Sequence, residues 1–273
     1  MQLDTRIKFY EGQYRQFLTP LVPVVIRLDG RAFHTFCQNM KKPFDEDFHN
    51  IMVNVTERLV IETNARVGYT QSDEISLLLH SDQWDSQLYF HGNVNKINSI
   101  AASFTTAWFH CFLKVSPIAV GHSMIPTFDC RCFNVPVEEV ANYFIWREQD
   151  AVRNSIQAAA QAHFSHKSLH GLNSSQLQDK LMREKGINWN DYPYYQKRGT
   201  YIRAVKTSEP ITVEERESLP AKHLARTNPN LAVERRKMVF GEVPILTTIV
   251  NRTEFLLYGE APVVKSGDEN DQA

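Results

Sequence analysis

Two acidic positions in this sequence stand where predicted strands meet turns, and their residue types could hold a divalent cation. Asp29 ends the apolar stretch "VVIRLD" and is followed by Gly30, while Asp73 and Glu74 stand where "RVGYTQ" gives way to "EISLLL". Carboxylates brought close together repel unless a cation shares them, and hard oxygen ligands suit Mg²⁺. Two such ions would clamp the attacking and leaving oxygens of a phosphoryl displacement. The alternative is that both aspartates only shape turns, where Asp is common.

The order of the predicted elements brings these acids together. Strands are predicted over 23–28, 66–71, 74–79 and 126–135, with helices over 44–64 and 95–113. This β-α-β-β-α-β order is that of the ferredoxin-like unit, an α+β fold with a four-stranded antiparallel sheet and both helices on one face. The third strand lies between the first two and runs against both. We therefore expect Asp29 and Asp73 to lie side by side at one edge of the sheet.

Composition narrows the class of protein. The 273 residues carry a net charge of −1, which excludes a wide basic surface and leaves only local patches for any nucleic acid. No apolar run of membrane-spanning length occurs, and the first 17 residues are too charged for a secretory signal. The four cysteines lack the paired spacing of a zinc site. The sequence therefore predicts a cytoplasmic protein without a membrane segment.

Four stretches resemble a known superfamily in their order and spacing. They are "RLDGRAFHTF", "KPFD", "YTQSDEISLLL" and "FDCRCF…YFIWREQDAVRNS", and the resemblance to the tRNA(His) guanylyltransferase superfamily runs from about Asp4 to about Arg203. Those enzymes have a fold similar to the polymerase palm and add nucleotides in the 3′-to-5′ direction. We therefore expect a palm-like catalytic domain over 1–137. A helical and β-hairpin extension over 138–273 should pack on it, with a tail disordered from about 265.

The resemblance also implies the residues of the site. Asp29, Asp73 and Glu74 correspond to the catalytic acids, and Asp29, the carbonyl of Gly30 and Asp73 correspond to the ligands of two Mg²⁺ ions. ATP and GTP would be substrates. The nucleotide-binding positions correspond to Asp29, Gly30, Arg31, Ala32, Phe33, His34, Ser72, Asp73 and Lys96. Lys96 stands at the start of a predicted helix, where anions bind readily, although a solvated lysine is an equal alternative.

Basic residues of the second half are candidates for contacts with RNA phosphates. A helix is predicted over 137–164, a second one is predicted to be capped by serine and ended by Gly186, and a hairpin is predicted over 194–206. The candidate RNA-binding residues are Arg27, Arg153, Asn154, Lys180, Arg183, Lys197 and Arg198. Clusters of this kind can equally serve solubility alone.

One departure from the superfamily bears on the activity. Eukaryotic members that add the extra guanylate to tRNA(His) carry His-Ile-Asn-Asn-Leu-Tyr-Asn after the Trp-Arg-Gln-Asp stretch, and here the text reads "AVRNSIQ". The chain is thus similar to the bacterial and archaeal branch, which repairs 5′-truncated tRNAs against a template. That branch activates a 5′-monophosphate with ATP, and the 3′-hydroxyl of the incoming nucleotide then attacks the activated end. Members are often homotetramers.

Three other functions remain open at this point. The first is the narrower tRNA(His) guanylyltransferase. The second is a nucleotide cyclase on the same topology, although "QSDEIS" stands where a diguanylate cyclase would carry its Gly-Gly-Asp/Glu-Glu-Phe motif. The third is a catalytically silent RNA-binding module, which the three intact acids argue against.

Overall fold

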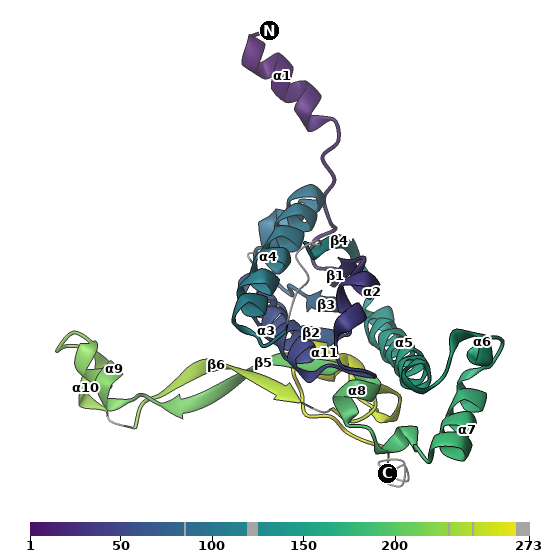
Figure 1. Ribbon diagram of the computed structural model, residues 1–273. Helices are drawn as coiled ribbons and strands as arrows, with labels where there is room; N and C mark the ends of the chain where they lie inside the picture. The colour runs from purple at the N-terminus through teal and green to yellow at the C-terminus, as the bar shows by residue number, and fades with distance from the viewer. Residues whose placement is uncertain (85, 119–124, 229, 242, 266–273) are drawn as a thin grey trace.

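The computed structural model describes residues 1–84, 86–118, 125–228, 230–241 and 243–265 (Figure 1). The tail predicted to be disordered from about 265 lies almost entirely outside these residues. None of the helices in the described part of the chain is long and apolar enough to span a bilayer.

One six-stranded sheet runs through the body of the molecule. Its strands are β1 (Val24–Arg31), β2 (Val67–Gln71), β3 (Glu74–Leu79), β4 (Thr127–Asn134), β5 (Thr200–Pro210) and β6 (Ala232–Gly241). Their order is β4-β1-β3-β2-β5-β6, and every neighbouring pair is antiparallel. The first four follow the predicted ferredoxin-like order, with β3 between β1 and β2, so the α+β fold class is confirmed. The extension continues the same sheet through β5 and β6.

Two helices cover one face of the sheet, as predicted. α3 (Glu46–Thr63) and α4 (Val94–Val115) pack on this face, and alternate residues of β1 point towards them: Val24, Ile26 and Leu28 are fully buried in this core. α3 starts at Asp45, whose side chain accepts a hydrogen bond from the backbone N–H of Phe48. Such an N-cap satisfies one of the donors that the first turn of a helix leaves unpaired.

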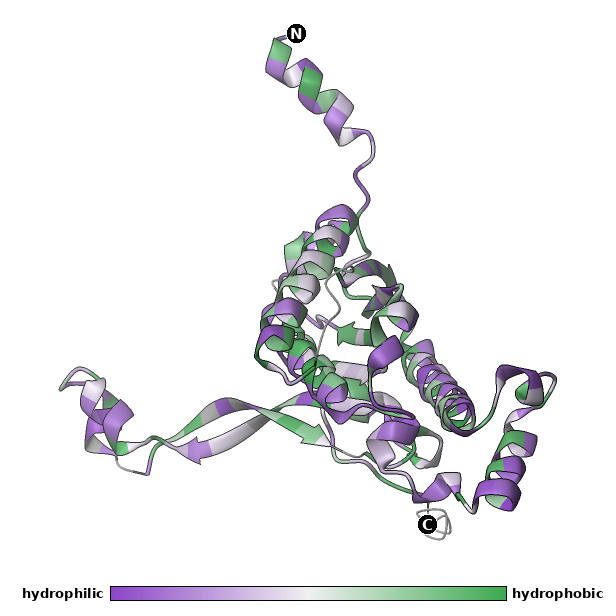
Figure 2. Ribbon diagram, viewed as in Figure 1, coloured by the Kyte–Doolittle hydropathy of each residue, from purple (hydrophilic) through white to green (hydrophobic). Residues whose placement is uncertain are grey.

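The opposite face is covered by the second half of the chain. α5 (Val137–His163), η4 (Leu246–Thr248) and α11 (Arg252–Tyr258) pack there against Val25, Tyr69 and Leu78. Figure 2 shows hydrophilic and hydrophobic residues mixed along α5, whose buried side chains include Val140, Phe144 and Ile156. Because side chains alternate along a strand, Arg27 and Asp29 of β1 lie on this same side of the sheet as α5.

The remaining elements connect or extend this body. They are α1 (Leu3–Gly12), α2 (Phe33–Phe36), η1 (Cys37–Asn39), η2 (Tyr89–Gly92), α6 (His166–Leu169), α7 (Ser174–Lys185), η3 (Trp189–Asp191), α8 (Tyr194–Arg198), α9 (Val213–Ser218) and α10 (Leu224–Thr227). α1 buries no residue and stands away from the body, and β5 and β6 form a long projecting arm with α9 and α10 at its tip (Figure 1).

Two details of the second half differ from the sequence-based expectation. The cap of α7 is Asn173 rather than a serine, because the Asn173 side chain accepts from the backbone N–H of Gln176 while the Gln176 side chain accepts from that of Asn173. Gly186 does end this helix, at φ +67°. The hairpin predicted over 194–206 is wrong. α8 fills its first half, and β5 pairs instead with β6, which is distant in sequence.

Candidate active site

The two aspartates that the sequence singled out lie at one edge of the sheet. Asp29 of β1 stands opposite Glu74 of β3, and the backbone N–H of Gly30 donates to the backbone carbonyl oxygen of Asp73 over 3.1 Å. The turn between β2 and β3 is only two residues long, and Ser72 adopts φ +50° within it. The short turn therefore fixes Asp73 beside the end of β1.

The Asp73 carboxyl group is in an unusual electrostatic environment. Burial is the main reason that its pKa rises from 3.8 to about 6, and the neighbouring Asp29 charge raises it further. The Ser72 hydroxyl donates to Asp73 Oδ1 over 3.1 Å and opposes that rise. Two adjacent acids with few compensating donors form a place where a cation would be stabilised.

Glu74, the third predicted catalytic acid, is neutralised by arginines. Its side chain is 8% exposed and accepts from Arg147 Nη1 at 2.9 and 2.8 Å and from Arg27 Nη2 at 2.5 Å. Arg147 is itself only 2% exposed, and Arg27 also lies 3.6 Å from Asp29. These bonds occupy both carboxylate oxygens. The structure therefore places Glu74 as a counter-ion beside the aspartates rather than as a free ligand.

Gly30 and Phe33 explain how the chain turns so sharply after β1. A Cβ atom on Gly30 would come within 2.3 Å of the Phe33 ring, so only glycine fits at this position. Ala32 then takes a left-handed conformation, at φ +58°. The Phe33 ring packs at 5.0 Å from Phe128 and 5.3 Å from Phe109. The predicted nucleotide-binding stretch is thus anchored to the core by Phe33, while His34 remains exposed.

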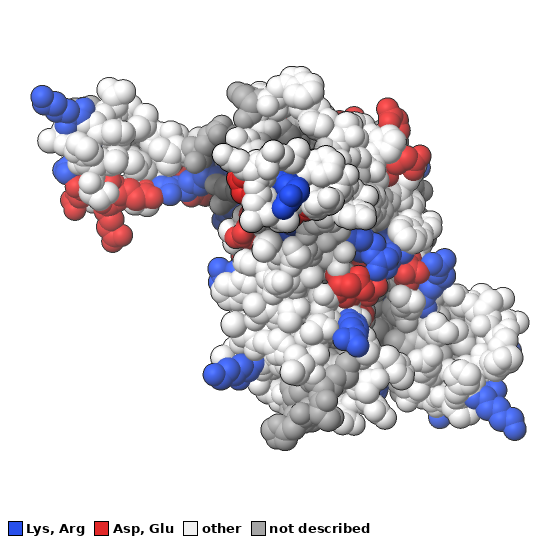
Figure 3. Space-filling view, turned by 90° about the horizontal axis from the view of Figure 1, so that it is seen from above, with Lys and Arg blue, Asp and Glu red and all other residues white. Residues whose placement is uncertain are grey.

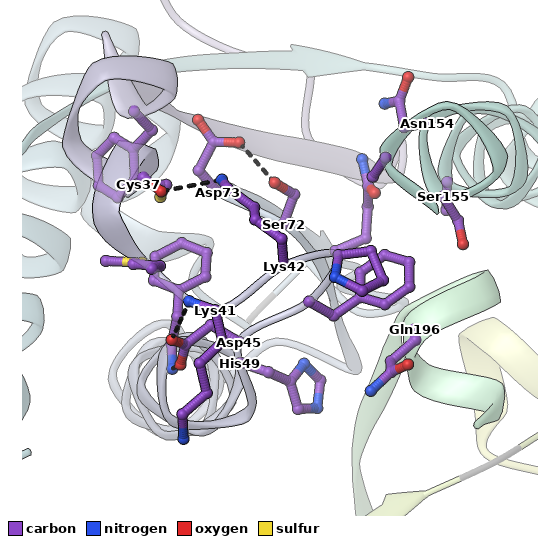
Figure 4. A pocket seen from close by; sticks show the side chains of 18 of the residues that line it. Cys37, Lys41, Lys42, Asp45, His49, Ser72, Asp73, Asn154, Ser155 and Gln196 are labelled. Atoms are coloured by element: carbon purple, nitrogen blue, oxygen red, sulfur yellow. Dashed lines mark hydrogen bonds between the residues drawn. The ribbon is translucent and has the colours of Figure 1, made fainter. Parts of the chain in front are cut away.

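A cavity of about 600 Å³ opens beside Asp73 (Figure 4). Its walls come from the segment between α2 and α3, the β2–β3 turn, α5 and α8, and they include His34, Cys37, Lys41, Lys42, Asp45, His49, Ser72, Asp73, Asn154, Ser155, Tyr195 and Gln196. Lys42 Nζ donates to the carbonyl oxygen of Cys37 over 3.0 Å. The cavity thus combines Asp73 from the edge of the sheet, lysines from the segment before α3 and amide side chains from α5 and α8.

An aromatic pair lines the side of the cavity formed by α3 and α8. The rings of His49 and Tyr195 stack with their centroids 4.3 Å apart, and Gln196 Nε2 donates to the Tyr195 hydroxyl. Burial lowers the pKa of His49 from 6.5 to about 4, so the ring is neutral at pH 7. A neutral aromatic wall with amide groups suits a planar, uncharged ring such as a nucleobase.

Lys96 is the one predicted nucleotide-binding residue that lies far from this cavity. Lys96 stands at the start of α4. Further along the same helix, the His110 side chain hydrogen-bonds to the Pro126 carbonyl oxygen. Pro126 directly precedes β4, whose Phe128 pairs with Gly30, so this end of α4 lies close to Gly30. Lys96 and His110 are 14 positions apart (110 − 96), which corresponds to roughly 20 Å along a helix. Within one chain, Lys96 therefore lies at the opposite end of the sheet from Asp29. Arg31 ends β1 and is exposed.

The predicted RNA-binding residues divide between two sides of α5 and the helices beyond it. Asn154 lines the cavity beside Asp73, whereas Arg153 and Arg198 line a second cavity of about 560 Å³ between α5, α7 and η4. Lys180 and Arg183 are on α7, where they pair with Glu184 and Asp179, and Lys197 Nζ donates to the Asn190 carbonyl. Figure 3 shows basic and acidic side chains intermixed on the face that it presents rather than a broad basic face.

The sequence model described as tRNAHis guanylyltransferase matches residues 4–136. A solved bacterial tRNA(HIS) guanylyltransferase-like protein in complex with ATP is 45% identical, with a TM-score of 0.70, over 74% of this chain and 88% of that one. The chain belongs to the tRNAHis guanylyltransferase family. It is therefore a nucleotidyltransferase.

Two further family members extend the comparison. A bacterial tRNA(HIS) guanylyltransferase-like protein solved in complex with GTP is 35% identical, with a TM-score of 0.68, and the match covers 90% of this chain and 94% of that one. The tRNA(His) guanylyltransferase of Saccharomyces cerevisiae is 29% identical over 215 residues, 70% of this chain and 88% of that protein.

The geometry of the cavity brings in residues to which the sequence alone assigned no role. Lys42 lies within the "KPFD" stretch that carried the resemblance, yet it was not assigned a role. Lys42 lines the same cavity as Asp73 and is placed to contact a phosphate chain there. His49 and Tyr195 belong to α3 and α8, which are far apart in sequence, and nothing in the sequence alone pairs them.

Proposed function

We propose that this guanylyltransferase-family enzyme adds nucleotides to the 5′ ends of truncated tRNAs in the 3′-to-5′ direction, against a template and after activation of the 5′-monophosphate by ATP. The observation that carries the proposal is the edge formed by Asp29, Gly30 and Asp73, which adjoins a cavity of about 600 Å³ with lysines on its wall. Acids and lysines side by side are the donor set that nucleoside triphosphate chemistry uses.

The residues at this edge fit Mg²⁺. Asp29 and Asp73 are adjacent carboxylates, and burial together with the Asp29 charge disfavours ionised Asp73 in the absence of a cation. Among the described residues, no group of three or more His, Cys, Asp or Glu side chains could hold a metal. A cation would therefore take two carboxylates and the Gly30 carbonyl, with phosphate oxygens completing its shell, as Mg²⁺ usually does. Bound there, Mg²⁺ ions would neutralise charge on the attacking and leaving oxygens.

The chain's own groups would bind and orient the substrates. Lys41 and Lys42 would contact the triphosphate, and the hydroxyl of Ser72 would orient the Asp73 carboxylate. The base would lie against the neutral His49 ring. Both stages are phosphoryl displacements without a protein nucleophile, so positioning and charge neutralisation supply the acceleration. Arg27, Arg153, Asn154, Lys180, Arg183, Lys197 and Arg198 would contact the RNA.

The narrower tRNA(His) guanylyltransferase is the second candidate, because the family model carries that description and the yeast relative that name. The residues of α5 that line the cavity favour the repair activity. They are Ala151, Asn154, Ser155, Gln157, Ala158 and Gln161, with none of the His and Tyr side chains of the eukaryotic motif. We also propose a homotetramer, because α1 buries none of its residues within the chain and exposes Leu3, Ile7 and Tyr10 at helical spacing.

The decisive experiment is an extension assay on a 5′-truncated tRNA with Mg²⁺, ATP and each nucleotide omitted in turn. Repair predicts that addition stops where the template demands the missing nucleotide, whereas guanylyl addition to full-length tRNA(His) would need no pairing partner. Asp29→Ala and Asp73→Ala should each reduce addition below detection with the fold intact. Asp82→Ala, which removes an exposed acid paired with Arg66, is the matched control. Addition by either aspartate variant would contradict the metal assignment.

A further inference from the structure

The side of the sheet that carries Asp29 also carries an exposed tryptophan. Trp146 of α5 keeps 46% of its surface exposed, whereas few other large aromatic residues of the body are exposed. Its ring lies 5.8 Å from the Arg27 guanidinium, which in turn lies 3.6 Å from Asp29. An indole left open next to the acidic edge needs an explanation, because burial of its apolar surface would be favourable.

The Trp146 ring is held on one side by a fixed guanidinium. Arg147 lies 3.5 Å from the ring centroid, and both of its bonds from Nη1 go to Glu74, the residue opposite Asp29. The Tyr143 ring packs against the edge of the indole at 5.9 Å. A buried cation thus packs over the indole and the Arg27 guanidinium lies 5.8 Å from its centroid, while 46% of the residue's surface remains exposed. The ring is also coupled through Glu74 to the strand pair that holds the aspartates.

The arginines around this exposed indole are ion-paired within the chain and keep further N–H donors for a phosphate. Arg27 lies near the ring and pairs with Glu74, Arg131 stands next to Arg27 in the register of β1 and β4 and pairs with Asp129, and Arg153 follows two turns later on α5 and pairs with Asp150. Aromatic faces stack on bases of any sequence, and arginines beside them contact the phosphates. A rigid aromatic ring with arginine side chains beside it is the arrangement that such stacking requires.

We infer that Trp146 is a stacking platform for the terminal base pair of the RNA end that is being extended. This inference rests on the proposed function, since it supposes that an RNA 5′ end approaches Asp29. Arg147 packs on the Trp146 ring and bonds to Glu74, so the position of the ring is fixed relative to the aspartates. A terminal base pair stacked on this ring would hold its 5′ phosphate beside the aspartates, and any base could stack in this way. Trp146 is therefore a positioning residue, which acts on the RNA end and leaves the nucleoside triphosphate cavity unaffected.

The test uses the full-length protein and short RNA hairpins with a recessed 5′ end. Trp146→Leu keeps an apolar side chain but removes the stacking face, so the dissociation constant for the hairpin should rise about tenfold. Trp146→Phe keeps an aromatic face and should stay within about threefold of the wild type. ATP binding should be unchanged in both variants. Trp84→Leu, which removes an indole that is 80% exposed, is the matched control and should bind the hairpin normally.

A spectroscopic readout separates stacking from a structural role. Hairpins with an open end should quench the tryptophan emission of the wild type and of the Trp84 variant, and this quenching should be lost in Trp146→Phe. Closed dumbbell RNA, which has no terminal pair, should not quench. Wild-type affinity in Trp146→Leu would overturn the inference, as would quenching that persists in Trp146→Phe. A changed oligomeric state in Trp146→Leu would instead make the ring a contact between copies. Failure of the wild type to bind any RNA end would count against the proposed function itself.

Discussion

Glu74→Gln distinguishes a counter-ion from a metal ligand at the acidic edge. The substitution removes the negative charge that faces Arg147 and Arg27, whose side chains are 2% and 18% exposed. Breaking a buried ion pair by removing one partner costs about 3–5 kcal/mol. We expect the lower end, about 3 kcal/mol, because Arg147 Nη2 keeps a second carboxylate, Asp150, at 3.4 Å. For a chain of this size that corresponds to a melting temperature lower by roughly 8 °C.

The assay is urea unfolding followed by intrinsic fluorescence, with thermal unfolding as a second readout. Asp129→Asn is the matched control, because Asp129 stands in the same cross-strand row and pairs with Arg131 at 2.9 Å on the exposed surface. An exposed pair of this kind contributes less than about 1 kcal/mol. The Glu74→Gln/Arg147→Met double variant should lose no more stability than the worse single variant, since both single changes break the same contact.

The opposite result would refute this assignment of Glu74. If the Glu74→Gln variant unfolds at the wild-type urea concentration while its affinity for Mg²⁺ in the presence of ATP collapses, Glu74 ligates the ion. A loss of stability with Mg²⁺ affinity retained at low temperature would instead support the counter-ion role. The outcome matters because Glu74 follows Asp73 directly in the chain, and the sequence gives the two acids the same apparent role.

Two further predictions concern the body of the protein. Burial raises the pKa of Glu148 from 4.5 to about 7. Between these two pH values the folded state binds a proton that the unfolded state has released. The free energy of unfolding should therefore fall by about 3 kcal/mol as the pH rises through that window. Glu148→Gln should remove the contribution of Glu148 to the slope in urea titrations at pH 4.5 and 8 and leave that of Asp73, and an unchanged slope would contradict the assignment. Gly199→Ala should destabilise by about 2 kcal/mol or more in the same assay, because its φ is +79° and the new Cβ would lie 2.7 Å from the Thr70 carbonyl oxygen. Wild-type stability would show that the chain relaxes there.

The catalytic half of the fold could be predicted because its signals are local. Hydrophobic alternation in "VVIRLD" and helical spacing in α3 place each element, and the β-α-β-β-α-β order then fixes which strands are neighbours. Asp29 and Asp73 follow from that order alone. β5 could not be paired from the sequence in the same way, because its partner β6 begins 22 positions after β5 ends (232 − 210). Pairings over such separations leave no periodic trace in the sequence.

The roles of individual site residues were harder to predict than their positions, and Glu74 and Lys96 show why. Glu74 was predicted as a catalytic acid beside the metal ligands, but in the structure Arg147, 73 positions later, is bonded to it. Lys96 was predicted as a phosphate ligand by its place at a helix start, yet it lies roughly 20 Å along α4 from His110, at the end of the sheet opposite Asp29. The roles of Glu74 and Lys96 depend on the distances between helices and strands in the folded chain. The order of these elements along the sequence does not give those distances.

The alternation of β1 links the core to the chemistry of the site. Val24, Ile26 and Leu28 point towards α3 and α4, so Arg27 and Asp29 must point to the other face. α5 crosses that face and buries Arg147 against Glu74, while Trp146, its neighbour in sequence, remains exposed. A one-residue slip of β1 would exchange the two sets and bury Asp29 among phenylalanines. The register that packs the core is thus the same register that exposes the acidic edge, so stability and activity should fail together when β1 shifts.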